Sequence, residues 1–189
     1  VYVPVGAFYV GDGNTTNAFT PTRITNANAS LIGSGFPTGF TNSNTKFPNG
    51  FGAFYCMKYE ISQQQYVDFL NTLTVSQQSL CTSLPPTFPS GQAAMTSNFR
   101  VSPPGTPNDN VNRNGIDIMI PAKGDTAAVY ACNLDGDINF NEENDGQWLA
   151  CNFLLYSDWL AYMDWAGLRP MTELEYEKAC RGTLPAVKN

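Results

Sequence analysis

The sequence predicts an α+β domain in which short strands and about three short helices are set in long, irregular loops. Three observations favour this class. Helix-capping patterns occur at only a few places, strand-like alternation is confined to short segments, and polar stretches rich in Asn, Thr, Gly, Ser and Pro separate them. At 189 residues, 42% of them hydrophobic, the chain can bury one substantial core. A single domain over 1–189 is therefore expected.

The N-terminal third combines strands with one long loop. Residues 1–12 predict a strand, a turn and a second strand, with Gly6 at the bend. Residues 13–50 are too long and too polar for an ordinary connection, so an irregular loop pinned by scattered aromatics is expected. Residues 51–61 predict a further strand.

Helix starts identify three helical segments. Ser62 with Gln65, and Thr172 with Glu175, have the spacing of a capping box. Ser157 is suited to cap a third helix, which carries an apolar face. The predicted helices span 62–73, 157–166 and 172–181.

Residues 76–130 predict a second long irregular loop, because prolines interrupt most of its length. One strand is expected inside it. Ile116, Ile118 and Ile120 alternate with other residues, and Pro121 ends the pattern.

Composition limits the partners. The net charge is −6 and Lys plus Arg number only 10, so no basic surface for nucleic acid is expected. No apolar run approaches the ~20 residues that a membrane helix needs. Scarce charge, at 14%, and abundant small polar residues favour an extracellular or cell-surface protein.

The strongest local signal is an acidic loop over 133–145. Asn or Asp recurs at every second position from Asn133 to Asn141, and hard oxygen ligands of this kind suit Ca²⁺. Counted from Asn133 the loop resembles an EF-hand, with Ile138 in place of the glycine and Asn144 in place of the closing glutamate. The alternatives are a solvated acidic loop, another cation or a partner contact. The candidate ligands are Asn133, Asp135, Asp137, Asn139, Asn141, Glu142 and Asp145.

Two of the five cysteines flank this loop. Cys132 and Cys151 are expected to form a disulfide that closes it, consistent with an oxidising compartment. The alternative is that all five cysteines are buried thiols.

No catalytic constellation is recognisable. The chain has no histidine, which removes Ser-His and Cys-His pairs. The carboxylates of the last helix do not require a catalytic role. Those in its first turn are favoured by the positive N-terminal end of the helix, and Glu177 is expected to form an i,i+4 ion pair with Arg181. Trp159 and Trp165 are expected in the core. A core position is also favoured for Trp148, although it is the one tryptophan considered for surface stacking on glycans.

Three ordered blocks carry a family resemblance. They are V-P-V-G-A-F-Y-V-G from Val3, F-Y-C-M-K-Y-E-I-S from Phe54, and A-Y-M-D-W-A-G-L-R-P-M-T-E-L-E-Y-E-K-A-C-R-G from Ala161. Together they resemble the formylglycine-generating, sulfatase-modifying family, which has a C-type-lectin-like fold. The motif residues carried over are Arg169, Thr172, Glu173, Glu175 and Arg181. Pro170 and Met171 depart from the family, in which a proline immediately precedes the threonine cap.

The resemblance covers about the first two thirds of such a domain. It implies that the reactive cysteines of the family's oxidases, and a partner for Cys180, would lie beyond the last residue. It also implies strand edges left open, which would recruit a strand from a continuation, a second copy or another protein.

The sequence therefore favours a non-catalytic extracellular or cell-surface module, used for adhesion, display or structural assembly and stabilised by calcium. One alternative is a copper-dependent formylglycine-generating oxidase whose catalytic half lies elsewhere. The other is a carbohydrate-binding, lectin-like module. The expected partners are other protein chains or copies of the same chain, with surface glycans as a further class.

Overall fold

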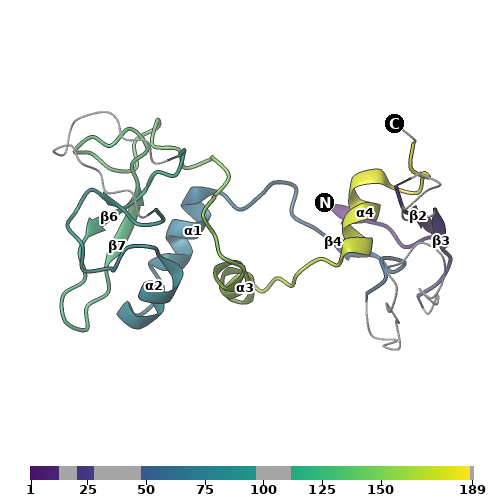
Figure 1. The fold of residues 1–189 in the computed structure, drawn as a ribbon, viewed down its shortest axis with the longest axis horizontal. Helices are drawn as coiled ribbons and strands as arrows, with labels where there is room; N and C mark the ends of the chain where they lie inside the picture. The colour runs from purple at the N-terminus through teal and green to yellow at the C-terminus, as the bar shows by residue number, and fades with distance from the viewer. Residues whose placement is uncertain (13–20, 28–47, 97–111, 188–189) are drawn as a thin grey trace. The chain divides into compact units, whose positions relative to one another are not determined.

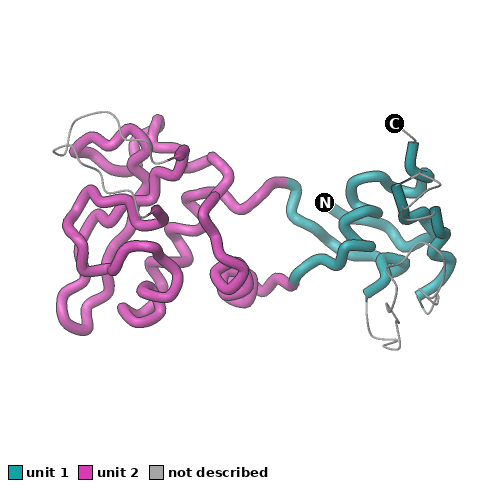
Figure 2. Tube along the Cα trace, in the orientation of Figure 1, with its two compact units in different colours: residues 1–58, 170–189 teal, residues 59–169 magenta. Residues whose placement is uncertain are grey.

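The computed structural model describes residues 1–12, 21–27, 48–96 and 112–187. The chain divides into two compact units (Figure 2): unit 1 comprises residues 1–58 and 170–189, and unit 2 comprises residues 59–169. Both combine helix with short antiparallel strands, so the predicted α+β, loop-rich class is confirmed. Most of the expected loop over 13–50, and residues 97–111 of the second loop, lie outside the described residues.

Unit 1 consists of two small antiparallel sheets and one helix (Figure 1). The pairs are β1 (Tyr2–Val3) with β4 (Phe54–Tyr55), and β2 (Phe8–Val10) with β3 (Thr22–Ile24), while α4 (Glu173–Arg181) packs against β2. The strand expected over 51–61 is shorter than predicted, because β1 offers it only two partner residues.

Helix α4 begins as predicted, with Thr172 and Glu175 forming both hydrogen bonds of the capping box. Leu174 and Lys178, one turn apart, are buried, whereas Tyr176 is exposed. Leu174 joins a small core with side chains of β2 and β3.

A buried lysine ties α4 to the loop before β4. Lys178 Nζ donates to Gly50 O at 2.6 Å and Phe51 O at 3.3 Å, and lies 5.4 Å from the centre of the Phe8 ring. Burial lowers the pKa of Lys178, while the Glu175 carboxylate raises it. The carbonyl acceptors supply the hydrogen bonds that a buried ammonium requires.

The predicted ion pair of α4 is confirmed. Arg181 pairs with Glu177 one turn before it. The pair also holds Gly11 after β2, because Arg181 Nη1 donates to Gly11 O at 2.7 Å and Gly11 N donates to Glu177 Oε2 at 3.1 Å. These charged residues have a structural role.

The described part of unit 2 contains three helices and a three-stranded antiparallel sheet of order β5-β6-β7. The elements are α1 (Gln63–Leu70), α2 (Val75–Cys81), β5 (Gln92–Ala93), β6 (Ile116–Ile120), β7 (Val129–Cys132) and α3 (Tyr156–Trp165). Helix α1 packs against β7, and α3 contacts α1 and α2 (Figure 1). The strand predicted from the isoleucine alternation is β6. Helix α2 was not predicted, although Thr74 and Gln77 form a capping box at its start.

Helix α1 presents an apolar face to the core of unit 2. Tyr66, Val67, Phe69 and Leu70 are buried, and they share one core with Ile116 and Ile118 of β6. Tyr66 also donates its hydroxyl to Cys81 O at 3.0 Å, which links α1 to the end of α2.

Helix α3 begins one residue earlier than expected, and Ser157 is not its cap. The cap position is Leu155, whose N–H donates to Asp158 Oδ2 at 2.9 Å. The acidic residue in the first turn thus satisfies the N–H of the cap residue, whereas a serine cap would accept from an N–H of the first turn. Trp159 packs against the core as predicted, but Trp165 is 46% exposed, so its expected core position is wrong.

Carboxamide side chains close the outer edge of β7 in place of a fourth strand. They pair with every second residue: Gln78 with Ala128, Asn71 with Tyr130, and Asn141 with Cys132. Each of these N–H groups donates to the facing side-chain oxygen at 2.8–3.0 Å. The amide groups of Gln78 and Asn71, and the backbone N–H of Asn141, donate in return. On this side of the sheet, the expectation of an open strand edge is wrong.

We predict that Gln78→Met lowers the free energy of unfolding of unit 2 by about 3 kcal/mol. Methionine keeps the side-chain volume but leaves the Ala128 carbonyl and N–H without their partner. It also removes one of the two bonds to the Leu70 carbonyl, which keeps the bond from Leu73 N. Urea unfolding measures the change. The control is Ser79→Ala, at the next residue of α2, whose side chain is exposed. This substitution should change stability by about 0.5 kcal/mol or less. Equal effects of the two substitutions would contradict the assigned role of Gln78.

Candidate metal centre

Both ends of the acidic loop are attached to the core of unit 2. The loop leaves β7 after Cys132 and returns through residues 147–151, which run beside residues 61–64 at the start of α1. Gln64 N donates to Gln147 O at 3.1 Å, Gln63 N to Leu149 O at 2.9 Å, and Cys151 N to Ile61 O at 2.7 Å. The loop is thus anchored to the core at both ends.

Three carboxylates of the loop gather at one place. One oxygen atom from each of Asp135, Asp137 and Glu142 lies within 4.8 Å of the other two. Two oxygens that bind one Ca²⁺ at 2.3–2.6 Å are separated by at most about 5 Å. The spacing therefore allows all three to bind a single cation.

Local hydrogen bonds hold the first two carboxylates in place. Asp135 Oδ1 accepts from Asp137 N at 3.2 Å, and Asp137 Oδ1 accepts from Asn139 N at 2.6 Å. Asn144 Nδ2 donates to Asp135 Oδ2 at 2.5 Å. These turns fold the loop so that alternate side chains meet, as the sequence pattern predicts.

A fourth carboxylate, that of Asp145, is fully buried beside the cluster. Its Oδ2 accepts from Glu142 N at 2.7 Å, whereas its Oδ1 has no hydrogen-bond partner among the described residues. Burial raises the pKa of Asp145, the bond from Glu142 N lowers it, and the nearby charges of Asp135, Glu142 and Asp137 raise it further. A buried carboxylate oxygen without a partner is costly, and a cation would satisfy it.

In the described ranges, no lysine or arginine forms an ion pair with any of the four carboxylates. Hard carboxylate oxygens in this number suit a divalent cation such as Ca²⁺ or Mg²⁺ more than a soft metal. The loop is therefore an acidic cluster that could bind a metal ion.

The three predicted asparagine ligands lie differently. Asn141 does not face the cluster, because its Oδ1 accepts from Cys132 N at 3.0 Å and so closes β7. Asn133 Nδ2 donates to the buried Asp117 Oδ2 at 2.9 Å. Asn139 Nδ2 lies 3.4 Å from Asp137 Oδ2. The structure brings together the four predicted acidic ligands, which are Asp135, Asp137, Glu142 and Asp145. It does not bring Asn141 to them.

A different register explains this grouping. With Gly136 at the glycine position of an EF-hand loop, Asn133, Asp135 and Glu142 fall at positions three, five and twelve. Gly136 has φ of 75°, as the sharp turn of such a loop requires. The first position is then Ala131, which is buried in β7 and offers no ligand. The Asp-Gly pair was the signal that could have set this register from sequence.

All five cysteines lie in the described part of the chain, and all are free thiols. The expected bond between Cys132 and Cys151 is not formed in this structure. Burial raises the pKa of both thiols to about 12, and for Cys151 the nearby Cys132 adds to the effect. Cys132 is buried, and its Sγ lies 3.9 Å from Gln64 Oε1.

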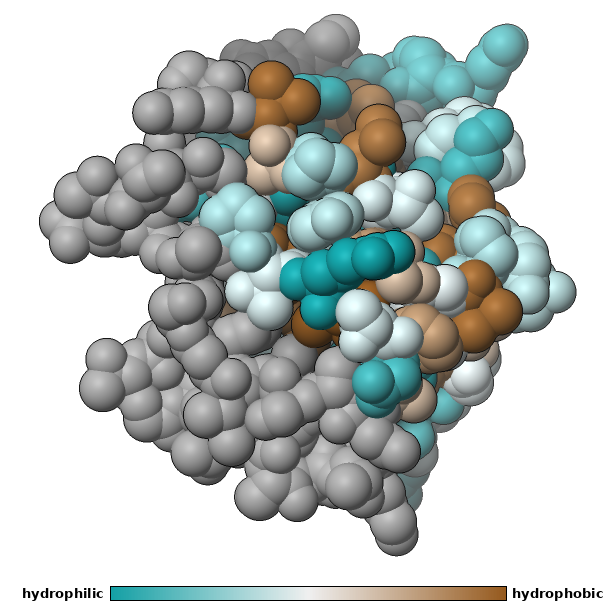
Figure 3. Space-filling view, turned by 90° about the vertical axis from the view of Figure 1, so that its right-hand side faces the viewer, coloured by the Kyte–Doolittle hydropathy of each residue, from teal (hydrophilic) through white to brown (hydrophobic). Residues whose placement is uncertain are grey.

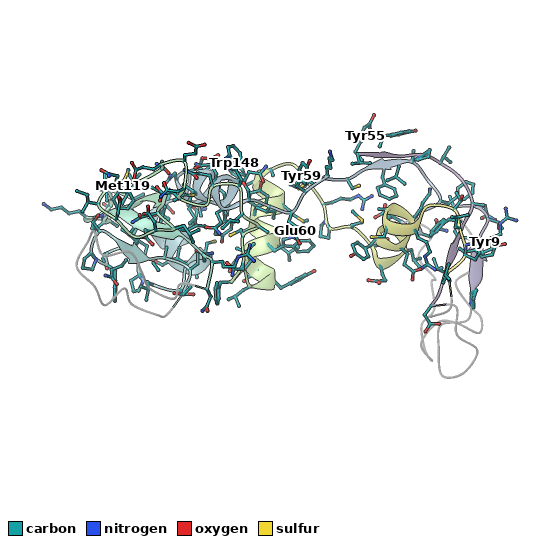
Figure 4. All side chains as sticks on the ribbon, turned by 90° about the horizontal axis from the view of Figure 1, so that it is seen from above. Tyr9, Tyr55, Tyr59, Glu60, Met119 and Trp148 are labelled. Atoms are coloured by element: carbon teal, nitrogen blue, oxygen red, sulfur yellow. The ribbon has the colours of Figure 1, made fainter. Side chains whose placement is uncertain are left out.

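Several large apolar side chains are exposed. Trp148, which follows the acidic loop, is 85% exposed, so the core position favoured for it is wrong. Figure 4 labels Trp148 in unit 2 and Tyr55 in unit 1, where Tyr55 is 82% exposed and packs against Tyr2. On the face shown in Figure 3, hydrophobic and hydrophilic residues are mixed in the coloured, described part of the surface.

Comparisons of the chain with protein-family models, with curated proteins and with solved structures find no match. The described helices include none that is both long enough and apolar enough to cross a membrane.

We predict that Asp145→Asn stabilises the cation-free protein at pH 7. Burial raises the pKa of Asp145, so the folded state binds its proton more tightly than the unfolded state does. The folded state therefore loses stability as pH rises through that pKa, and a neutral amide removes the loss. Asparagine Oδ1 can still accept from Glu142 N.

Thermal unfolding from pH 4 to pH 8, in a chelator, measures this effect. The substituted chain should show a smaller fall in Tm with rising pH than the parent chain. Glu143→Gln, an exposed neighbour outside the cluster, is the control. A lower Tm for Asp145→Asn throughout the range would contradict the prediction.

Proposed function

We propose that the loop over 133–145 is a Ca²⁺ site that stabilises unit 2, and that the chain is a non-catalytic, extracellular or cell-surface module used for adhesion, display or structural assembly. One observation carries the proposal. A buried oxygen of Asp145, without a partner among the described residues, lies beside three carboxylates spaced for a single cation.

Calcium fits this ligand set better than its competitors. Ca²⁺ accepts six to eight oxygen ligands in flexible geometry, whereas Mg²⁺ demands a near-ideal octahedron. Zn²⁺ prefers nitrogen and sulfur, and the chain contains no histidine. Three carboxylates of one loop, with the Asp145 carboxylate beside them, supply the irregular set of oxygen ligands that calcium tolerates.

The extracellular setting is supported by composition and by the expected affinity. Calcium sites of extracellular modules bind with Kd of roughly 10⁻⁴–10⁻³ M. The loop lacks the first EF-hand ligand, so we expect an affinity in this weak range. The resemblance to the formylglycine-generating family supports a module of that scaffold, and the absence of histidine from the sequence disfavours its iron-dependent chemistry.

The adjacent residues Glu142 and Glu143 provide the sharpest test of the cation site. Only Glu142 belongs to the cluster, and both are exposed. We predict that Ca²⁺ at millimolar concentration raises the Tm of the parent chain and of Glu143→Gln, and that Glu142→Gln weakens binding about tenfold or more. With Kd of roughly 10⁻⁴–10⁻³ M, 1 mM Ca²⁺ is about one to ten times Kd, and the bound ion adds about 0.4–1.4 kcal/mol of stability.

Isothermal titration calorimetry and thermal unfolding with and without chelator measure these effects. Mg²⁺ at the same concentration should stabilise less than Ca²⁺. If neither cation changes the Tm of the parent chain, the loop is only a solvated acidic surface and the proposal fails.

The exposure of Trp148 supports carbohydrate binding as a second candidate. An aromatic ring that is 85% exposed can stack on the apolar face of a sugar. We predict that any glycan bound by the chain is lost in Trp148→Ala, while Tyr55→Ala in unit 1 leaves its binding unchanged. A glycan array followed by titration measures this. Retained glycan binding in Trp148→Ala would exclude the site.

A further inference from the structure

We propose that Asn49 is a site of spontaneous deamidation, and that its conversion to aspartate or isoaspartate disrupts unit 1. The sequence contains two Asn-Gly pairs, Asn49-Gly50 and Asn114-Gly115. An asparagine followed by glycine is especially prone to this reaction, because glycine has no side chain to hinder attack of its backbone nitrogen on the asparagine amide. The inference concerns a covalent modification of unit 1 and is independent of the proposed cation site in unit 2.

The reaction needs only water as a co-reactant. Gly50 N loses its proton to hydroxide and attacks Asn49 Cγ, the bond from Cγ to Nδ2 breaks, and ammonia leaves with a proton taken from water. The product is a cyclic succinimide. Water then opens the ring at one of two bonds. Cleavage between the nitrogen and Cγ yields aspartate, and cleavage between the nitrogen and the backbone carbonyl carbon yields isoaspartate. One water is consumed and one ammonia is released.

Asn49 is a buried structural residue of unit 1, with only 3% of its surface exposed. Its Oδ1 accepts from Phe51 N at 3.1 Å. Its Nδ2 donates to Asn26 O at 3.0 Å and to Ala27 O at 3.2 Å. These three bonds hold the side-chain amide in place, so attack by Gly50 N requires that they open. The rate of deamidation therefore depends on how often this part of unit 1 opens.

The second pair, in unit 2, is protected more strongly. Asn114 is fully buried, and its Oδ1 accepts from Ile116 N at 3.1 Å, in the same pattern as Asn49. In addition, the attacking nitrogen is itself bonded, because Gly115 N donates to Gln63 Oε1 at 2.8 Å. Both of these bonds are buried, whereas the three bonds of Asn49 are partly buried. Asn114 is thus a matched internal reference for Asn49.

The cores beside the two pairs also differ in size. A Cβ atom at Gly50 would lie 2.8 Å from Phe8 Cζ, so this pair borders the small core of unit 1. Among the described residues, that core consists of Phe8, Val10, Ile24 and Leu174, with Phe51 packed against it. Ile116, next to Gly115, belongs to the larger core of unit 2. Regions with few buried apolar contacts open locally at lower free energy, so Asn49 should open more often than Asn114.

Either product removes contacts of unit 1. Aspartate has no N–H to donate, so a carboxylate oxygen would face the carbonyls of Asn26 and Ala27. Isoaspartate also lengthens the backbone by one atom before Gly50, whose carbonyl accepts from the buried Lys178 Nζ at 2.6 Å. Neither product reverts to asparagine. Each opening that leads to reaction therefore converts a reversible local opening into a permanent change.

The main test uses the full parent chain. It is incubated at mildly alkaline pH, either folded or unfolded in guanidinium chloride, and deamidation at both asparagines is followed by peptide mapping with mass spectrometry. The rate in the folded chain is divided by the rate in the unfolded chain, so that the effect of neighbouring residues cancels. We expect this ratio to be at least about tenfold larger for Asn49 than for Asn114.

Two substitutions test the structural consequence. Asn49→Asp reproduces one product, and Asn26→Asp adds the same charge at an exposed asparagine of unit 1. We expect Asn49→Asp to lower the Tm by about 5 °C or more, and Asn26→Asp to change it by about 2 °C or less. The rates measured in the parent chain remain decisive if Asn49→Asp does not fold.

An equal ratio at the two asparagines, or a larger ratio at Asn114, would overturn the assignment of the site to Asn49. It would also be overturned if Asn49 reacts in the unfolded chain and stays unmodified in the folded one. Equal stability of Asn49→Asp and Asn26→Asp would overturn the structural consequence.

Discussion

Closure of one strand edge by side-chain amides is the constraint on which unit 2 depends. A buried strand edge leaves N–H and C=O groups that must find partners. A carboxamide carries a donor and an acceptor spaced like those of a peptide group, so Gln78 and Asn71 each replace one residue of a missing strand. Asn141 completes the edge at Cys132, and it belongs to the acidic loop. The contact that ends the sheet therefore also holds residue Asn141 of the loop against the end of β7.

The candidate site combines strong positioning with unfavourable electrostatics. Backbone amides hold Asp135, Asp137 and Asp145 in place, but no described lysine or arginine pairs with them. Structures keep such an arrangement when something else compensates the charge, and functional sites commonly carry local costs of this kind. A divalent cation would offset the repulsion and satisfy the buried oxygen of Asp145 together. This is why the buried carboxylate, more than the acidic composition, points to a ligand.

Local patterns could be predicted from the sequence, and tertiary roles could not. The capping boxes at Ser62 and Thr172 and the isoleucine alternation of β6 were read correctly, because each depends on a few neighbouring residues. The acidic side chains of the site were also identified. Asn141 was misread, since an asparagine at a ligand position and one that caps a strand look the same in sequence. The exposure of Trp148 was missed because it is set by packing against residues far away in the sequence.

The amide-rich composition, which predicted long loops, also explains how a small sheet can do without further strands. The outer edge of β7 is closed by side chains, and on the β5 side Ser83 N and Leu84 N donate to Ala94 O at 2.9 and 3.1 Å. An open edge would have favoured assembly by strand addition. With these groups already paired, strand addition along β7 would have to displace Asn71 and Gln78 from buried hydrogen bonds. A partner of the kind proposed would bind unit 2 at lower cost through exposed side chains. Among the described large apolar residues of unit 2, Trp148 beside the acidic loop is the most exposed.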